Sequence, residues 1–257
     1  MKKLIIFIFI ISSSGLFSQE AINSMLEIKY DIHYNTEIPN TKKGTLFIDK
    51  SLNKSLFVYG KNKDKKVDQN DDENVIRVRF RESKRFNYIN FTTDTTYSKE
   101  KVFNDEFIIA EKKADLEWKL IDETKKIDSI SVKKAILSFR GRNYVAWYSD
   151  KYPLRFGPWK FQNLPGLIIE IYDETKRYHW VVTSISKNND TKIINFSEMK
   201  DEIKKISLKE FVDKRYNKSI GLLNESRLPR GTISNKRKIK RNGIEIKFEW
   251  EEDKKED

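Results

Sequence analysis

The chain contains no cysteine, and this absence limits both its chemistry and the sources of its stability. Without cysteine there is no disulfide, no thiol nucleophile and no lipid-modified N-terminal cysteine. The folded chain must therefore be stabilised by the burial of apolar side chains.

Histidine is nearly as scarce, since only His33 and His179 occur among the 257 residues. A His-Glu-x-x-His zinc motif is therefore impossible, and Gly-x-Ser-x-Gly and glycine-rich phosphate loops are also missing from the sequence. Asp31 and His33 share a strand face and could supply two metal ligands, but no third ligand is identifiable. We predict no catalytic residue, no metal and no cofactor, so an enzyme is the minority interpretation.

Long hydrophobic runs are missing too. The run from Leu4 to Ile11 is shorter than the ~20 residues that span a bilayer. It follows Lys2 and Lys3 and precedes small residues at 12–15 and at Ser18, which is the layout of a secretory signal peptide. We predict that residues 1–18 are removed and that the protein is periplasmic or secreted, with no transmembrane span in the mature chain.

The charge is unbalanced toward lysine and arginine, with 51 of these against 39 acidic residues. For an exported protein this favours anionic partners such as lipid phosphates or acidic glycans, and we predict no nucleic-acid partner. Alternatively, the lysines only keep an apolar-rich sheet in solution.

Most of the remaining chain has the pattern of β-strands. Residues 26–34 alternate between apolar and polar side chains, as in a half-buried strand. The other strand-like runs are GTLFID, KSLFVYG, NVIRVRF, RFNYINFTT, EFIIAEK, LIIEIY and RYHWVVTSI. We predict a mainly β fold, a curved antiparallel sheet or open half-barrel of about eight to twelve strands. Residues 19–250 should form one domain and residues 251–257 a disordered charged tail.

Two local patterns stand near the C-terminal end. Ser207 followed by Glu210 is a capping box, and it predicts one helix with Leu208, Phe211 and Val212 on its apolar face. Asn242-Gly243 between RKIKR and IEIKFEW predicts a two-residue hairpin, with Lys240 opposite Glu245. The basic run KRKIKR is then one solvated strand face.

The most unusual segment, residues 135–173, reads AILSFRGRNYVAWYSDKYPLRFGPWKFQNLPGLIIEIYD. RGRN is expected to form a turn between two strands. Pro165-Gly166 suits the centre of a type II turn, where glycine accepts a positive φ angle. LIIEIY is expected to be a strand buried on both faces. Its Glu170 would need a partner if buried, and the candidates are Arg140, Arg142 and Arg155.

This segment resembles the signature of the GLPGLI family, exported proteins of outer-membrane bacteria named for that hexapeptide. The resemblance covers about residues 135–175. It rests on three groups of residues: Ala146-Trp147-Tyr148, Gly157-Pro158, and the run Leu164, Pro165, Gly166, Leu167 and Ile168. Asn163 stands in place of the family's first glycine, and asparagine tolerates a left-handed backbone better than most residues. The resemblance implies export and a motif, but no reaction.

Two roles remain open for the segment. In the structural role, a buried turn and central strand hold the sheet together through Gly157, Pro158, Leu164, Pro165, Gly166, Leu167 and Ile168. In the binding role, a pocket is lined by Trp147, Tyr148, Trp159, Phe161 and Arg142.

The function that these patterns favour is an exported, non-enzymatic binding or carrier protein of the cell envelope. Its ligand would be apolar or an anionic, lipid-like molecule, or it would assist an outer-membrane protein in transport. The alternatives are a hydrolase with a site around His33 or Glu170, and a structural module that binds a partner protein.

Overall fold

The computed structural model describes residues 25–49, 53–60, 85–188, 203–218 and 241–251. The predicted signal peptide, the run NVIRVRF, the first arm of the C-terminal hairpin up to Lys240 and residues 252–257 lie outside these ranges. The strands are β1 (Met25–Tyr34), β2 (Asn40–Asp49), β3 (Lys54–Tyr59), β4 (Phe86–Asn90), β5 (Thr95–Val102), β6 (Asp105–Lys112), β7 (Lys119–Ile127), β8 (Ile130–Phe139), β9 (Arg142–Ser149), β10 (Leu167–Asp173), β11 (Tyr178–Asn188) and β12 (Lys204–Ser207).

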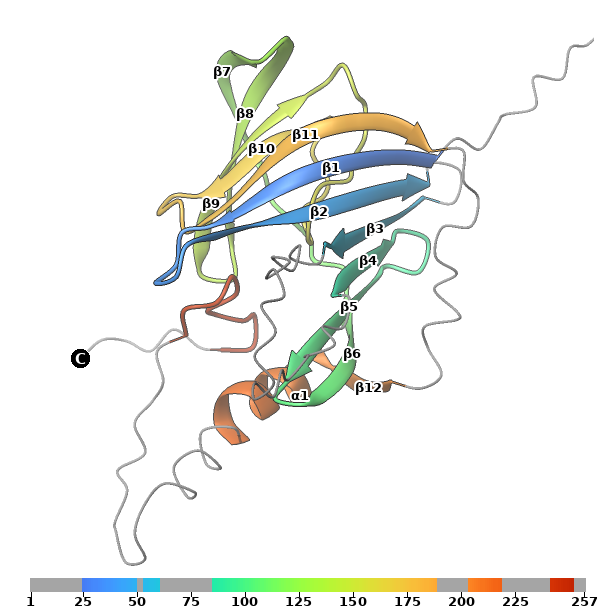
Figure 1. The fold of residues 1–257 in the computed structure, drawn as a ribbon, viewed down its shortest axis with the longest axis vertical. Coiled ribbons are helices and arrows are strands. Elements are labelled where there is room, and N and C mark those ends of the chain that lie inside the picture. The colour runs from blue at the N-terminus through green and yellow to red at the C-terminus, as the bar shows by residue number, and fades with distance from the viewer. Residues whose placement is uncertain (1–24, 50–52, 61–84, 189–202, 219–240, 252–257) are drawn as a thin grey trace, which may run out of the picture.

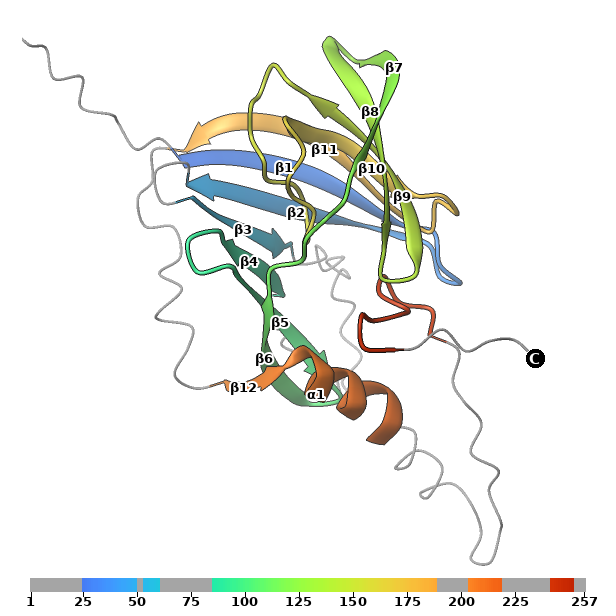
Figure 2. The same ribbon diagram turned by 180° about the vertical axis from the view of Figure 1, so that it is seen from behind.

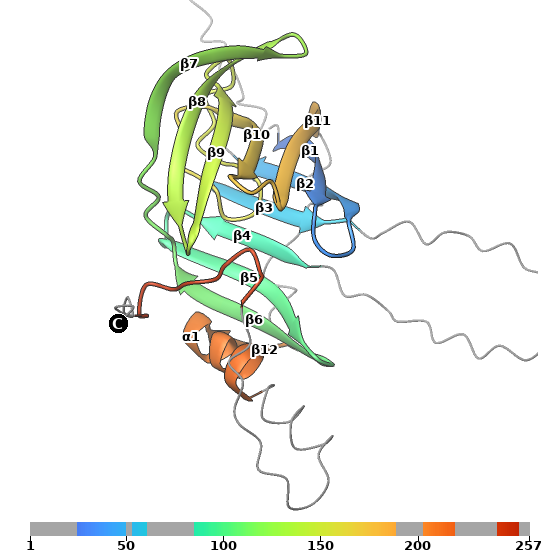
Figure 3. The ribbon, with the colours of Figure 1, turned by 90° about the vertical axis from the view of Figure 1, so that its left-hand side faces the viewer.

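These strands form one open, curved sheet in the order β12-β6-β5-β4-β3-β2-β1-β11-β10-β9-β8-β7 (Figure 1). Neighbouring strands are antiparallel except for β12, which runs parallel to β6. Figure 3 shows the sheet from the side as a curved wall that does not close on itself. The predicted fold class, a curved and mainly antiparallel sheet with one short helix near the C-terminal end, is confirmed.

The helix, α1 (Leu208–Val212), begins where the capping box places it. Ser207 is the N-cap, and its hydroxyl accepts the Glu210 N–H at 3.1 Å. Leu208, Phe211 and Val212 are buried against β6 and β12, so the apolar face is also as predicted. A π-helical turn, η2 (Asp213–Lys218), continues the chain.

The prediction of a C-terminal hairpin is wrong for residues 241–251, the part of it that the structure describes. IEIKFEW is not a strand, and Gly243 does not have a positive φ angle. Residues 241–251, here called the C-terminal strap, instead lie along the β8–β9 turn. The N–H groups of Ile246 and Lys247 donate to the Arg140 carbonyl at 3.0 and 3.1 Å. The strap is thus held by long-range contacts rather than by a neighbouring strand.

The turn that does have positive φ angles is Arg140-Gly141, between β8 and β9, at 47° and 81°. Two central residues with positive φ form the type I′ geometry that matches the twist of a hairpin. The expected turn at RGRN is therefore present. A Cβ on Gly141 would lie 2.6 Å from Ile246 Cγ1, so the glycine also lets the strap approach.

The main part of the core lies on one face of the sheet, here called the inner face, which carries Tyr30, Tyr144 and Trp180. These three side chains are at most 1% exposed. The pairing of β9 with β10 shifts between Ile168 and Glu170, leaving Ile169 as the extra residue of a bulge. Leu167, Ile168 and Ile169 are all buried, as the unbroken apolar run predicts.

Candidate functional site

The connection between β9 and β10 covers the inner face of the sheet (Figure 2). Its Phe161 is fully buried and meets the rings of Tyr144, Trp159 and Trp180 edge-on, at centroid distances of 4.9 to 5.6 Å. Trp159 also stacks on Trp180 at 6.4 Å. This part of the motif therefore packs as core, and the curved face is filled here by the chain itself.

The small residues of the motif allow close packing. A Cβ on Gly157 would lie 2.6 Å from Ile168 Cδ1, and one on Gly166 would lie 2.2 Å from the Ser149 carbonyl oxygen. Gly166 does not have a positive φ angle, so the predicted type II turn at Pro165-Gly166 is wrong. Pro165 is exposed, whereas Pro158 is buried and its carbonyl accepts the Phe161 N–H at 3.1 Å. The motif has two left-handed residues, Trp159 at φ 54° and Asn163 at φ 70°.

The five candidate ligand-binding residues do not meet at one place. Tyr148 and Trp147 are neighbours on β9 and point to opposite faces of the sheet. Trp147 lies on the outer face, where the Lys125 Nζ stands 4.2 Å from its ring centroid. Phe161 and Tyr148 are core residues. Of the five, Trp159 lines an inner cavity.

Arg142 holds the C-terminal strap rather than facing an open pocket. Its guanidinium donates to the Gly243 carbonyl at 2.7 Å and to Asp173 at 3.1 Å. Two tyrosine hydroxyls bind the neighbouring carbonyls of the strap: Tyr178 donates to the Asn242 carbonyl at 2.8 Å, and Tyr144 donates to the Ile244 carbonyl at 3.1 Å. Three successive strap carbonyls are therefore bound by side chains of the inner face.

The inner cavity lies where strands β3 to β6, α1 and the C-terminal strap meet, and has a volume of about 180 Å³. Its walls combine aromatic and charged side chains, among them Tyr59, Trp159, Tyr178, Arg85, Asn87 and Glu100. Asn87 is 2% exposed and donates its amide to Ser98 Oγ at 2.8 Å. Among the described residues nothing bonds to Asn87 Oδ1 or to Arg85 Nε. Two residues of the cavity wall thus each carry a buried polar atom, an acceptor in Asn87 and a donor in Arg85, without a partner among the described residues.

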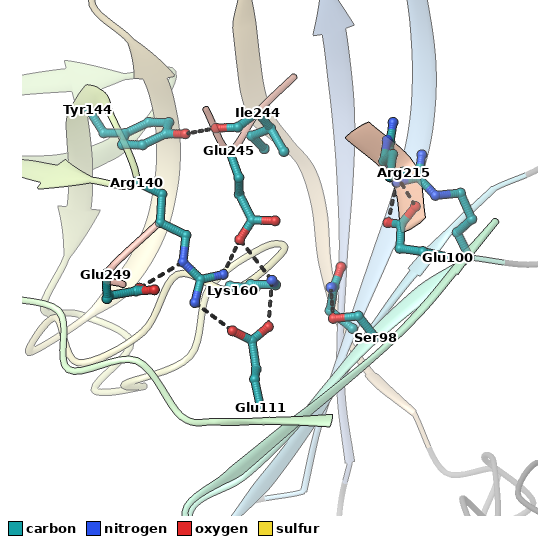
Figure 4. Close-up of polar contacts among 12 residues, drawn as sticks. Ser98, Glu100, Glu111, Arg140, Tyr144, Lys160, Arg215, Ile244, Glu245 and Glu249 are labelled. Carbon is teal, nitrogen blue, oxygen red and sulfur yellow. Dashed lines mark hydrogen bonds and ion pairs between the residues drawn. The ribbon is translucent and has the colours of Figure 1, made fainter. Parts of the chain in front are cut away.

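Two arginines share one carboxylate at this cavity. Arg85 forms an ion pair with Glu100, and Arg215 approaches the other oxygen of Glu100 at 4.0 Å (Figure 4). Burial opposes the charge of Arg85, but Glu100, together with smaller contributions from Tyr59 and Tyr34, outweighs burial and raises the pKa of the arginine. Burial also raises the pKa of the wall residue Tyr34 to about 12. The phenol therefore stays neutral, and the cluster keeps a positive excess.

An ion-pair network adjoins the cavity and joins four distant parts of the chain (Figure 4). Lys160 of the motif binds Glu111 of β6 at 2.6 Å and Glu245 of the strap at 2.9 Å. Arg140 binds both of these carboxylates and Glu249. Burial would lower the pKa of Lys160, but the attraction of the two carboxylates outweighs the effect of burial and raises this pKa. Burial would raise the pKa of Glu245, but Lys160 and Arg140 outweigh burial there and lower this pKa.

The outer face brings together the two histidines and Glu170. His33 and His179 are direct cross-strand partners, with ring centroids 5.5 Å apart. Glu170 accepts from His179 Nε2 at 3.0 Å and from Lys125 Nζ at 2.6 Å, so the predicted arginine partners are wrong. The pKa of Glu170 falls to about 2, mainly because of the hydrogen bond from His179. Burial would raise this pKa, and Lys125 lowers it further.

This arrangement does not make a recognised catalytic centre or a metal site with three protein ligands. The His179 and Glu170 pair is on the outer face, and the inner cavity does not include it. Within the described ranges, no group of three or more His, Asp or Glu side chains could hold a metal ion, and no helix is long and apolar enough to cross a membrane.

Sequence reasoning missed the residues that build the inner cavity. Asn87 lies in β4 and Arg85 directly precedes this strand, whereas Glu100 comes from β5 and Arg215 from η2. No short sequence pattern links these residues. One signal was present, because Asn87 interrupts the strand-like run RFNYINFTT at a position that proves to be buried. A buried asparagine needs hydrogen-bond partners, so it marks a polar site within a sheet.

No protein-family model matches the chain, and no curated protein matches it. Among solved structures, PNGF-II superposes on the chain in two crystal forms with 20% identity and a TM-score of 0.51. The match covers 75% and 74% of this chain but 33% and 32% of PNGF-II, so the chain spans about a third of that protein's length. At this identity the likeness concerns the fold alone. A LolA-superfamily protein from Nitrosomonas europaea matches over 65% of this chain and 87% of its own, with 7% identity and a TM-score of 0.30, which is too low to support an argument.

Proposed function

We propose that the protein is an exported, non-enzymatic binding or carrier protein of the cell envelope, and that the inner cavity is its ligand site. The observation that carries the proposal is a partly enclosed, partly charged cavity, and two of its wall residues, Asn87 and Arg85, each have a buried polar atom without a partner among the described residues. Buried polar groups without partners are rare in folded proteins and each needs a reason. A bound ligand with complementary groups supplies one.

The size of the cavity limits the ligand. A cavity of about 150 Å³ holds a molecule such as benzene, and this one measures about 180 Å³. It therefore accepts one ring or a short chain. A longer, lipid-like ligand would place only its head end here.

The walls set the polarity of the ligand. Tyr59, Trp159 and Tyr178 suit an apolar or aromatic body, because large flat side chains bury much area at little entropic cost. The two positive charges of Arg85 and Arg215 outnumber the one negative charge of Glu100, and this excess favours a ligand with an anionic group. The proposed ligand class is a small anionic amphiphile with a hydrogen-bond donor for Asn87.

Calorimetric titration of the purified chain with phenyl phosphate and octanoate tests this proposal, with benzyl alcohol and 1-octanol as uncharged counterparts. Either anion should bind at one site and at least tenfold more tightly than its counterpart, which corresponds to about 1.4 kcal/mol. Phenyl phosphate alone would indicate a ring-sized ligand, and octanoate alone a lipid-like one. If neither anion binds, the proposal is wrong.

Two arginine variants locate the binding. Arg85→Gln should abolish the preference for anions, because it removes a charge from the cavity wall. Arg177→Gln is the matched control, since Arg177 pairs with the exposed Glu37 and does not line the cavity. Equal losses in both variants would mean that the anions bind through general surface charge, and would overturn the assignment of the site.

A further inference from the structure

We propose that His33 and His179 form a two-histidine site for a late divalent transition-metal ion on the outer face of the sheet. The site bridges β1 and β11 and is independent of the inner cavity. It rests on three observations: the facing positions of the two residues, the hydrogen bonds on their rings, and their accessibility.

The two imidazoles have the separation that a shared ion requires. Two rings on one tetrahedral ion have centroids about 5 Å apart, because Zn–N bonds are about 2.0–2.1 Å long and a ring nitrogen lies about 1.1 Å from its centroid. The observed centroid distance is 5.5 Å. Since the residues are direct partners in the β1–β11 ladder, the sheet itself maintains this spacing.

Hydrogen bonds leave one ring nitrogen for metal on each histidine. An ionised carboxylate only accepts hydrogen bonds, so His179 Nε2 carries the proton that it shares with Glu170 Oε1, and Nδ1 keeps the lone pair. His33 Nδ1 bonds to Thr41 Oγ1 at 2.9 Å, which leaves Nε2. A carboxylate or hydroxyl behind a ligating imidazole is the usual second-layer support of metal sites, where it fixes the ring and its tautomer.

The charges around the pair are balanced by ion pairs. Lys125 of β7 is bound to Glu170, the carboxylate that contacts His179. Asp31 shares the outer face with His33 but is bound to Lys43 of β2. Both histidines are half-buried, so each side chain is partly exposed to solvent.

The chemistry of the ligands selects the ion. Imidazole nitrogen suits Zn²⁺, Cu²⁺ and Ni²⁺, whereas Mg²⁺ and Ca²⁺ prefer oxygen. Two protein ligands leave positions open for water or for a group on another molecule. The expected order of affinity is Cu²⁺ above Ni²⁺ and Zn²⁺, with no binding of Mg²⁺ at the same concentration.

The composition makes the experiment clean, because the chain has only these two histidines and no cysteine. The full chain is produced without a histidine tag and titrated with Zn²⁺, Cu²⁺ or Mg²⁺, while the two imidazole signals are followed by NMR and the ion count by calorimetry. One Zn²⁺ should bind per chain, shift both imidazole signals at the same concentration, and raise the melting temperature by clamping β1 to β11.

The variants His33→Gln and His179→Gln should each weaken Zn²⁺ binding at least tenfold and abolish the thermal shift. Glu170→Gln should weaken it less and keep both imidazoles responsive, since Glu170 positions His179 without touching the ion. Because these side chains are on the outer face, circular dichroism should show an unchanged fold. If either histidine variant binds Zn²⁺ like the parent, if only one imidazole responds, or if Mg²⁺ competes, the site does not exist.

Discussion

Asn163 donates its backbone N–H to the Arg155 carbonyl at 2.8 Å while its own backbone is left-handed, with φ at 70°. The bond closes the loop that carries Trp159 and Phe161 over the inner face. A left-handed residue with a branched side chain costs roughly 1–2 kcal/mol. Asn163→Gly should therefore leave the free energy of unfolding unchanged or slightly raised, and Asn163→Val should lower it by about 1 kcal/mol or more. Urea unfolding measures both, and equal values for the two variants would contradict the role of the turn.

Trp159 serves both the core and the cavity wall. Its side chain is 4% exposed, so Trp159→Ala should lower the free energy of unfolding by about 3–5 kcal/mol. It should also reduce the binding of phenyl phosphate. Trp147→Ala is the matched control: this tryptophan lies on the outer face, so the variant should bind the anion like the parent. A Trp159→Ala protein that melts like the parent would show that the aromatic cluster is not core.

The buried network around Arg140 should contribute far more than an exposed pair. Arg140→Met leaves Glu111 and Glu245 with one cation fewer, and breaking a buried pair on one side costs about 3–5 kcal/mol. Arg177→Met removes an exposed pair with Glu37, which solvent screens, so this variant should unfold close to the parent.

Hydrogen exchange of the strap separates this effect from general destabilisation. The N–H groups of Ile246 and Lys247, bonded to the Arg140 carbonyl, should lose protection in Arg140→Met well before the β1 amides do. Unchanged protection of residues 244–248 would mean that the network does not hold the strap.

Glu170 should make stability depend on acid pH. Its folded pKa is about 2, below the ordinary value of about 4.3 in an unfolded chain. The unfolded state therefore binds the proton more readily. The stabilisation by Glu170 is fully present above about pH 4.3 and is lost as the pH falls through about 2.

Urea midpoints of the parent and of Glu170→Gln at several pH values test this expectation. The parent should be more stable than the variant near neutral pH, and the difference should shrink below about pH 4. Because the carboxylate is partly exposed, solvent screening keeps the effect small. Glu117→Gln, at an exposed position, is the control, and a difference that grows toward acid pH would have the wrong sign.

Export remains a prediction from the N-terminal pattern. The intact mass of the protein recovered from the periplasm or the medium should correspond to a chain that starts near Gln19. Recovery of only full-length material from the cytoplasm would contradict it.

The sequence predicts those elements whose cause is local. Residues 26–34 alternate strictly and form β1, Ser207 caps α1, and the Arg140-Gly141 turn lies where a glycine separates two strands. β7 was not predicted, because KLIDETKKI lacks apolar alternation and is held by pairing with β8 alone. The sequence also did not predict the ion-pair partners of Glu170 and Glu245. The expected pairing of Lys240 with Glu245 followed from short-range register, whereas Arg140 and Lys160 come from segments 85 or more residues away.

The order of the strands also determines when the sheet can form. β1 pairs with β2 and with β11, so residues 25–34 reach their second neighbour only after residues 178–188 are available. Pairing across such a sequence separation requires an expensive loop closure and is slow. The hairpins β1–β2, β5–β6 and β8–β9 can form early, but the joint between β1 and β11 cannot. When the chain emerges from its N-terminus, the sheet therefore stays incomplete until residues 178–188 have emerged, so most of the sequence must be available before β1 has both of its neighbours.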